Sequence, residues 1–100
     1  MLTSKQRAFL RSLANPLETI VIVGKDGVTD NVVLQVSEAL KARELIKGKV
    51  LETALLTPRE VCGELCEKLR AEPVQVIGSK FVIYRENHDI PKENRIKLVK

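Results

Sequence analysis

The stretch Val21-Ile22-Val23-Gly24-Lys25-Asp26-Gly27-Val28-Thr29 joins an apolar run to a glycine-bracketed basic loop that leads directly into a predicted helix. The apolar run begins at Thr19 and is β-branched throughout, which predicts a short strand buried on both faces. Thr29 is placed to cap the helix that follows. Glycines let a backbone approach a ligand closely, and the first helical amides are unpaired donors at the positive end of the helix dipole. This loop can therefore hold a phosphate.

The charge of the chain favours an anionic partner. The 100 residues include 17 Lys and Arg against 13 Asp and Glu, a formal net charge of +4. Residues 1–50 and 92–100 are both net basic, whereas residues 51–91 are net acidic. Because like charges repel, the acidic middle is expected to face away from a polyanion such as RNA.

Several classes of protein find no support in the sequence. No apolar run approaches the roughly 20 residues that span a bilayer, and the first residues lack the apolar block of a signal peptide, so a cytoplasmic location is expected. Cys62 and Cys66 have helical i, i+4 spacing and are expected to be reduced and packed in or near the core. With His88 they are too few ligands for a structural zinc site, and the histidine is distant in sequence from both thiols. We therefore expect no metal, no cofactor and no nucleophilic catalysis.

Local signals predict seven elements. Thr3 and Gln6 form a capping box at the start of the first helix, and Thr57 with Pro58 marks the start of the third. Gly78-Ser79 separates two β-prone runs and predicts a tight hairpin. The predicted elements are helix 4–14, strand 19–23, helix 30–42, strand 45–51, a helix beginning at Thr57, and strands 74–77 and 80–85.

This order predicts an α/β (α+β) fold of the type αβαβαββ, with a mixed four-stranded sheet covered by helices on at least one face. Each strand-helix-strand passage is expected to join parallel neighbours through a right-handed crossover, and the hairpin is expected to add an antiparallel pair. Residues 1–86 form one predicted domain. Residues 87–100 form a basic tail that is expected to be mobile unless RNA or the domain orders it.

Four collinear segments resemble the CRM domain, the chloroplast RNA splicing and ribosome maturation module, in its stand-alone bacterial YhbY-type form. They are Leu2-Thr3-Ser4-Lys5-Gln6-Arg7, Val23-Gly24-Lys25-Asp26-Gly27-Val28-Thr29, Ala39-Leu40-Lys41-Ala42-Arg43-Glu44-Leu45-Ile46-Lys47-Gly48-Lys49-Val50 and Val76-Ile77-Gly78-Ser79-Lys80-Phe81-Val82-Ile83-Tyr84-Arg85. The resemblance implies RNA binding, association with precursors of the large ribosomal subunit, and a fold similar to the C-terminal domain of translation initiation factor three. Two departures are Gly48, which is expected to weaken a strand, and Ser79, which removes one possible phosphate contact.

The candidate RNA-binding residues fall into groups. The loop Gly24, Lys25, Asp26 and Gly27 is expected to hold backbone phosphate, and Lys41, Arg43, Lys47 and Lys49 are expected to extend the contact. Lys5 is a secondary contact, and Arg85 is a further candidate that could instead pair with a carboxylate such as Glu86 or Glu52. Phe9 and Phe81 lie on apolar patterns typical of a core, which favours recognition of backbone and shape over base stacking.

The leading hypothesis is a non-catalytic protein that binds ribosomal RNA during large-subunit assembly, with ribosomal proteins as further candidate partners. One alternative is a small enzyme or binding domain for a phosphorylated metabolite, in which Asp26 or Asp30 would be the nearby acid or base inside a closed pocket. Another is a protein-interaction module that docks through an exposed apolar patch.

Overall fold

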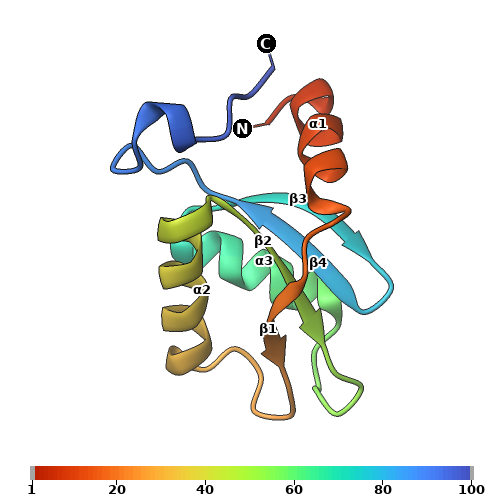
Figure 1. Cartoon of the computed structure of the whole chain (residues 1–100). Coiled ribbons are helices and arrows are strands. Elements are labelled where there is room, and N and C mark those ends of the chain that lie inside the picture. The colour runs from red at the N-terminus through yellow and green to blue at the C-terminus, as the bar shows by residue number, and fades with distance from the viewer. Residues whose placement is uncertain (1, 100) are drawn as a thin grey trace.

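The regular elements follow one another in the predicted order (Figure 1). The structure, a computed structural model, describes residues 2–99. Within that range the elements are α1 (Ser4–Ala14), β1 (Thr19–Val23), α2 (Asp30–Arg43), β2 (Leu45–Val50), α3 (Pro58–Leu69), β3 (Glu72–Ile77), β4 (Lys80–Tyr84) and a short 3₁₀ turn at Lys92–Asn94. Every predicted helix and strand is confirmed. The predicted and observed bounds differ by at most two residues, apart from the end of α3, for which no bound is predicted.

Side-chain caps explain where the helices begin. Thr3 and Thr57 each accept a hydrogen bond from the amide three residues later, and Gln6 and Glu60 accept one in return, so α1 and α3 both start with a complete capping box. The hydrogen bonds from Thr57 hold the pKa of Glu60 below its usual value. Thr29 caps α2 by accepting a hydrogen bond from the Val32 amide at 3.2 Å. Two of the three helices end at a residue with a positive φ angle, Glu44 after α2 and Arg70 after α3.

The sheet has the strand order β1-β2-β4-β3. β1 and β2 are parallel, as expected, and β4 is antiparallel to both β2 and β3. The expectation that both strand-helix-strand passages join parallel neighbours is wrong for the second passage, because β4 lies between β2 and β3. β1 is an edge strand of this sheet, and its Ile20 and Ile22, which alternate with buried Val21 and Val23, are 39% and 58% exposed. The expectation that this strand is buried on both faces is therefore wrong.

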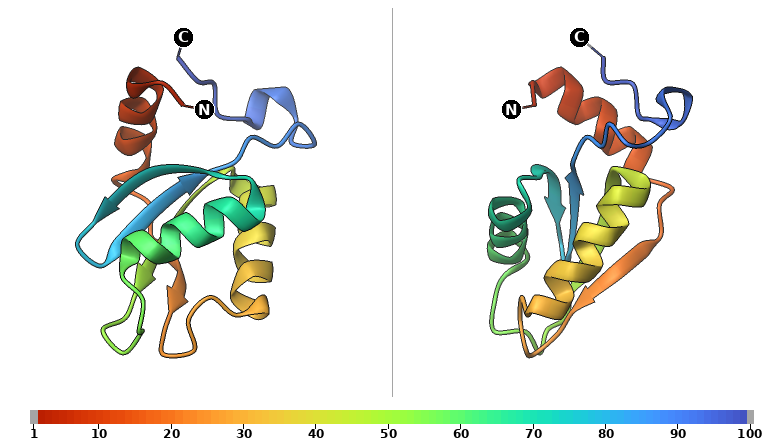
Figure 2. Two further views of the ribbon diagram at one scale, coloured as in Figure 1. Left: turned by 180° about the vertical axis from the view of Figure 1, so that it is seen from behind. Right: turned by 90° about the vertical axis from the view of Figure 1, so that its left-hand side faces the viewer.

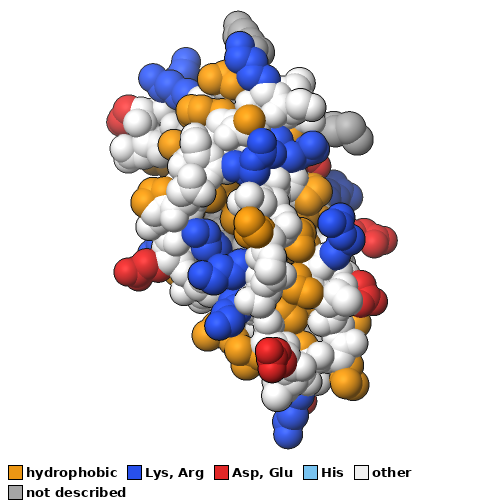
Figure 3. Space-filling view, turned by 90° about the vertical axis from the view of Figure 1, so that its right-hand side faces the viewer, with side chains coloured by type: hydrophobic (Ala, Val, Ile, Leu, Met, Phe, Trp, Pro, Cys, Tyr) orange, Lys and Arg blue, Asp and Glu red, His pale blue; other side chains and the backbone are white. Residues whose placement is uncertain are grey.

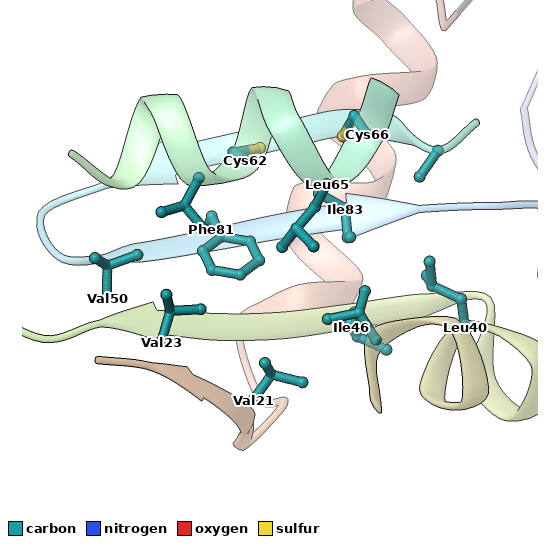
Figure 4. Close-up of a cluster of buried hydrophobic side chains, with 13 residues drawn as sticks. Val21, Val23, Leu40, Ile46, Val50, Cys62, Leu65, Cys66, Phe81 and Ile83 are labelled. Atoms are coloured by element: carbon teal, nitrogen blue, oxygen red, sulfur yellow. The ribbon is translucent and has the colours of Figure 1, made fainter. Parts of the chain in front are cut away.

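The two faces of the sheet carry separate apolar clusters. On one face α2 and α3 pack on a cluster that includes Val23, Leu40, Ile46 and Phe81 (Figure 4). On the other face α1 and the C-terminal segment pack on a smaller cluster around Leu10, Leu45, Val74, Val82 and Tyr84. Figure 2 shows α1 and the C-terminal segment together at the end of the molecule away from the loop that follows β1. The second face of the sheet is therefore covered at one end only.

The cysteines belong to the first cluster. Cys62 and Cys66 are free and buried, which confirms the prediction of a reduced pair in the core. The hydrogen bond between the two thiols and their burial raise the pKa of Cys66 well above its usual value. No group of three or more His, Cys, Asp or Glu side chains within residues 2–99 is placed to hold a metal ion. In the same range, no helix is both long enough and apolar enough to cross a membrane.

Buried Glu44 connects the C-terminal segment to the domain. Its carboxylate accepts hydrogen bonds from the backbone amides of Asn87 and Ile96, both at 2.8 Å. Ile96 and Leu98 pack against the second cluster. The sequence predicts that this segment is mobile unless RNA or the domain orders it. In the structure it packs on the domain through Ile96 and Leu98.

Gly48 makes room for Phe81, the largest of the fully buried side chains. A Cβ atom at this position would lie 2.6 and 2.8 Å from Cε1 and Cε2 of Phe81, and closer still to Cζ. Phe81 is directly opposite Gly48 in the antiparallel β2–β4 ladder and is fully buried. The expectation that Gly48 weakens the strand is therefore wrong, because the missing side chain is what admits the ring.

We predict that Gly48→Ala lowers the free energy of unfolding by about 2 kcal/mol, since an overpacked core must shift side chains or backbone. Gly63→Ala is the matched control because Gly63 lies within α3 with open space around its Cα, so alanine there should raise stability by up to about 1 kcal/mol. Urea unfolding of both variants measures the difference. Equal stabilities of the two variants would contradict the packing described for Gly48.

Candidate functional site

The loop after β1 is a β-turn with an exposed tip. The Gly27 amide donates to the Gly24 carbonyl at 3.0 Å, which closes the turn and places Lys25 and Asp26 at its centre. Both central side chains are exposed. Gly27 has a φ angle of 71°, a conformation that favours glycine. The turn therefore presents one cation and one carboxylate to solvent.

The turn leaves some backbone amides available and uses others. The Gly27 amide already closes the turn, and the Val32 amide is held by Thr29. Among the described residues, no hydrogen bond engages the amides of Lys25 and Asp26. The first amides of α2 come before the first helical hydrogen bond, which Val33 donates to Thr29. Donors for an anion are thus the tip of the turn and the first turn of α2, with the Gly27 and Val32 amides excluded.

The two glycines of the turn have different roles in the fold. An alanine at Gly27 would be strained by its positive φ angle, although its Cβ would be only in ordinary contact with Leu56 at 3.6 Å. At Gly24 the φ angle is not positive, and a Cβ would make an ordinary contact of 3.6 Å with Leu51. The fold therefore requires glycine at position 27 and does not require it at position 24.

We expect Gly27→Ala to lower the free energy of unfolding by about 1 kcal/mol, the cost of a left-handed conformation for a residue with a Cβ. Gly24→Ala should leave stability unchanged or raise it by up to about 1 kcal/mol, because alanine restricts the unfolded chain. Thermal unfolding of the two variants provides the comparison. A loss at Gly24 as large as that at Gly27 would show that this description of the turn is wrong.

The parallel pairing of β1 and β2 brings other segments beside this turn. The Leu51 amide donates to the Val23 carbonyl at 2.9 Å, and the Val50 amide donates to the Ser79 carbonyl at 2.8 Å. The loops after β1 and β2 consequently lie side by side at the lower end of the molecule in Figure 1. Leu55, in the loop after β2, is 93% exposed.

Lys47 and Lys49 lie on the face of the sheet away from α2 and α3. They alternate along β2 with Ile46, Gly48 and Val50, which are buried on the opposite face. Both lysines are half-buried. The Lys47 ammonium donates to the Asn15 carbonyl at 3.4 Å, which directs it toward the end of α1. Lys49 pairs with Ile22 in the ladder and is the nearer of the two to the turn.

Lys41 and Arg43 occupy the last turn of α2 and are exposed. The helix has 14 residues, so they lie about 20 Å from the Gly24–Gly27 turn at 1.5 Å per residue. Lys41 forms an exposed ion pair with Glu38 at 3.6 Å. Lys5, in the first turn of α1, is also exposed and belongs to the end of the molecule opposite the turn. The predicted cations therefore divide between the two ends of the domain.

Arg85 follows β4 and connects two helices. Its guanidinium donates to the Leu69 carbonyl of α3 and to the Ser37 carbonyl of α2, both at 3.2 Å. The structural role that the sequence suggested was an ion pair with Glu86 or Glu52. The partners are carbonyl oxygens instead, so Arg85 contributes to the packing of α2 and α3.

Sequence reasoning did not select Lys80 as a site residue. The ladder places Lys80 directly opposite Lys49, and its side chain is exposed. The alternation of Lys80 with buried Phe81 could have assigned its face, but the sequence gives no register between β2 and β4. The pairing of the two lysines is therefore a property that only the folded structure reveals.

Residues 2–85 match the family model of the CRS1 / YhbY (CRM) domain. The chain belongs to this family. It is 46% identical over 95 residues to the probable RNA-binding protein YqeI of Bacillus subtilis, covering 95% of both chains. It is 34% identical to an RNA-binding protein of Haemophilus influenzae, covering 88% of this chain and 89% of the relative. A hypothetical protein of Staphylococcus aureus, described as a candidate RNA-binding protein, has a solution structure that is similar with a TM-score of 0.81. That match has 42% identity and covers 99% of this CRM chain and all of the other.

Proposed function

We propose that this CRM protein is a non-catalytic RNA-binding protein that contacts the backbone of ribosomal RNA during assembly of the large ribosomal subunit. The turn at Gly24–Gly27 is the primary contact. The free amides of Lys25 and Asp26 and the first amides of α2 hold a phosphate, and the Lys25 ammonium neutralises it. Lys49 lies on the neighbouring strand and extends the contact. The remaining predicted contacts are secondary. They are Lys47 and Arg85, together with Lys41, Arg43 and Lys5 at the other end of the domain.

The observation that carries this proposal is the exposed turn with unused backbone donors in a family whose relatives are named RNA-binding proteins. Gly24 adds support. The fold does not require glycine at position 24. A glycine there does allow the RNA backbone to approach the main chain closely, because no Cβ stands in the way.

The surface beside the turn favours an extended ligand over a phosphorylated metabolite. Two hollows open at this end, and they are lined by residues 49–58 with Gly78 and Ser79, not by the Gly24–Gly27 turn itself. The larger hollow, of about 500 Å³, lies around Leu2, Tyr84 and Arg85 at the opposite end. A small-molecule enzyme would need its phosphate-holding turn and an acid or base inside one closed pocket. We therefore place the enzyme second to the RNA-binding protein.

The test is binding to fragments of large-subunit ribosomal RNA at several salt concentrations, with an unrelated RNA of equal length as the competitor. We predict that Lys25→Glu weakens binding at least fivefold at 0.15 M salt, because one phosphate contact is lost and a repulsion is added. Gly27→Asp should weaken binding by a similar factor, and Gly24→Ala should weaken it without loss of stability.

Lys68→Gln serves as the control for loss of one positive charge. Lys68 is on α3, across the sheet from Lys49, and pairs with Glu64 at 3.2 Å. Affinity should stay within twofold of the parent in this variant. If all three turn variants keep the parent affinity while remaining folded, the turn is not the RNA-binding site. If the unrelated RNA competes equally well, the ribosomal part of the proposal fails.

A further inference from the structure

One row of side chains crosses all four strands of the sheet. The ladder pairs Ile22 of β1 with Lys49 of β2, Lys49 with Lys80 of β4, and Lys80 with Ile77 of β3. Residues paired in a ladder share a face of the sheet. Two lysines thus stand side by side at the centre of the row, with an isoleucine at each end.

This row lies on the uncovered part of the sheet. Lys80 alternates with Phe81, and Lys49 with Gly48 and Val50, all of which belong to the face under α2 and α3. α1 and the C-terminal segment cover the same face as the row, but only around Leu45, Val82 and Tyr84. Ile22 and Ile77 are 58% and 62% exposed. Figure 3 views the molecule from the side away from α2 and shows Lys and Arg side chains interspersed with hydrophobic ones.

The lysine pair is expected to destabilise the domain when nothing is bound. Directly opposed residues of an antiparallel pair hold their Cβ atoms roughly 5 Å apart, and like charges at that separation repel. Within residues 2–99 no carboxylate lies within ion-pair distance of either ammonium group. Glu52 lines a hollow together with Lys49 but does not pair with it. An arrangement that costs stability and is left uncompensated inside the protein is typical of a ligand site.

The surroundings of the pair fit a nucleic-acid backbone. Lys49, Thr53 and Ser79 line an open hollow of about 420 Å³ next to the pair, which adds two hydroxyl donors. Gly24 lies two residues beyond Ile22 along β1, about 7 Å at the usual rise of a strand. The pair and the turn are therefore near enough for one RNA strand to contact both.

We infer that Lys49 and Lys80 form a second phosphate-binding site, which holds the RNA backbone next to the one bound at the Gly24–Gly27 turn. This inference rests on the proposed function and adds Lys80 to the contact surface. The two sites together define a path for the RNA over the protein, from the turn across the uncovered face of the sheet toward β3. An acidic protein segment is the competing occupant, and the experiment separates the two.

The experiment compares Lys49→Gln, Lys80→Gln and the double variant with Lys68→Gln, using the same ribosomal RNA fragments over a range of salt concentrations. Each single variant should bind roughly fivefold more weakly at 0.15 M salt, and each should reduce the slope of log K against log salt by about 1. Lys68→Gln should change neither quantity. Lys80→Gln should also melt about 1–4 °C higher than the parent at low salt, because the repulsion is removed, and this gain should disappear at high salt.

The outcomes distinguish this inference from the proposed function. Parent affinity in the double variant, together with weakened binding in Lys25→Glu, would overturn the inference and leave the turn as the RNA site. Parent affinity in the sheet and turn variants alike would overturn both. Weaker binding accompanied by a lower melting temperature would assign the lysines a structural role and contradict the inference. Binding of the same variants to polyglutamate, a probe for an acidic protein segment, is measured in parallel. Loss of polyglutamate binding in the double variant without loss of RNA binding would overturn the inference and assign the row to an acidic protein.

Discussion

The parallel pairing of β1 with β2 is the constraint on which the rest of the structure depends. Parallel neighbours end at the same edge of a sheet, so the turn after Val23 and the loop after Val50 must meet there. The connection between the two strands must run back along the sheet, and α2 does so over its 14 residues. The parallel pairing therefore brings the turn beside Lys49. It also places Lys41 and Arg43, at the end of α2, about 20 Å away from the turn.

The second strand carries both the packing and the charge of the domain. Ile46, Gly48 and Val50 belong to the face that α2 and α3 cover, and Lys47 and Lys49 alternate with them on the other face. Gly48 contributes to both the packing and the arrangement of charge. Its missing side chain leaves room for the Phe81 ring on one face, and it lies in the chain between Lys47 and Lys49, which are on the other face. Lys49 and Lys80 lie on the uncovered part of this face, because α1 and the C-terminal segment pack at the far end of the sheet.

Local chemistry made most of the fold predictable from the sequence. The Thr3 and Thr57 capping boxes locate two helices, and the Gly78-Ser79 turn locates the hairpin. The sheet order could not be predicted, because no local signal says that β4 inserts between β2 and β3. Ile22 is a second example, since an apolar run predicts a buried strand, whereas Ile22 lies on the part of the sheet face that α1 and the C-terminal segment leave uncovered. The turn was recognisable as a candidate site from its glycines. The pairing of Lys49 with Lys80 and the inward role of Arg85 depend on long-range contacts that spacing cannot reveal.

The central claim is that RNA binds at the edge of the sheet where β1 and β2 end. The most direct measurement is the change in backbone amide chemical shifts when a fragment of large-subunit ribosomal RNA is added to isotope-labelled protein. The largest changes should fall on residues 24–31, 49–53 and 79–80, and the amides of α3 should change little. Changes confined to α3, or to α1 and the C-terminal segment, with the Gly24–Gly27 turn unaffected, would contradict the claim.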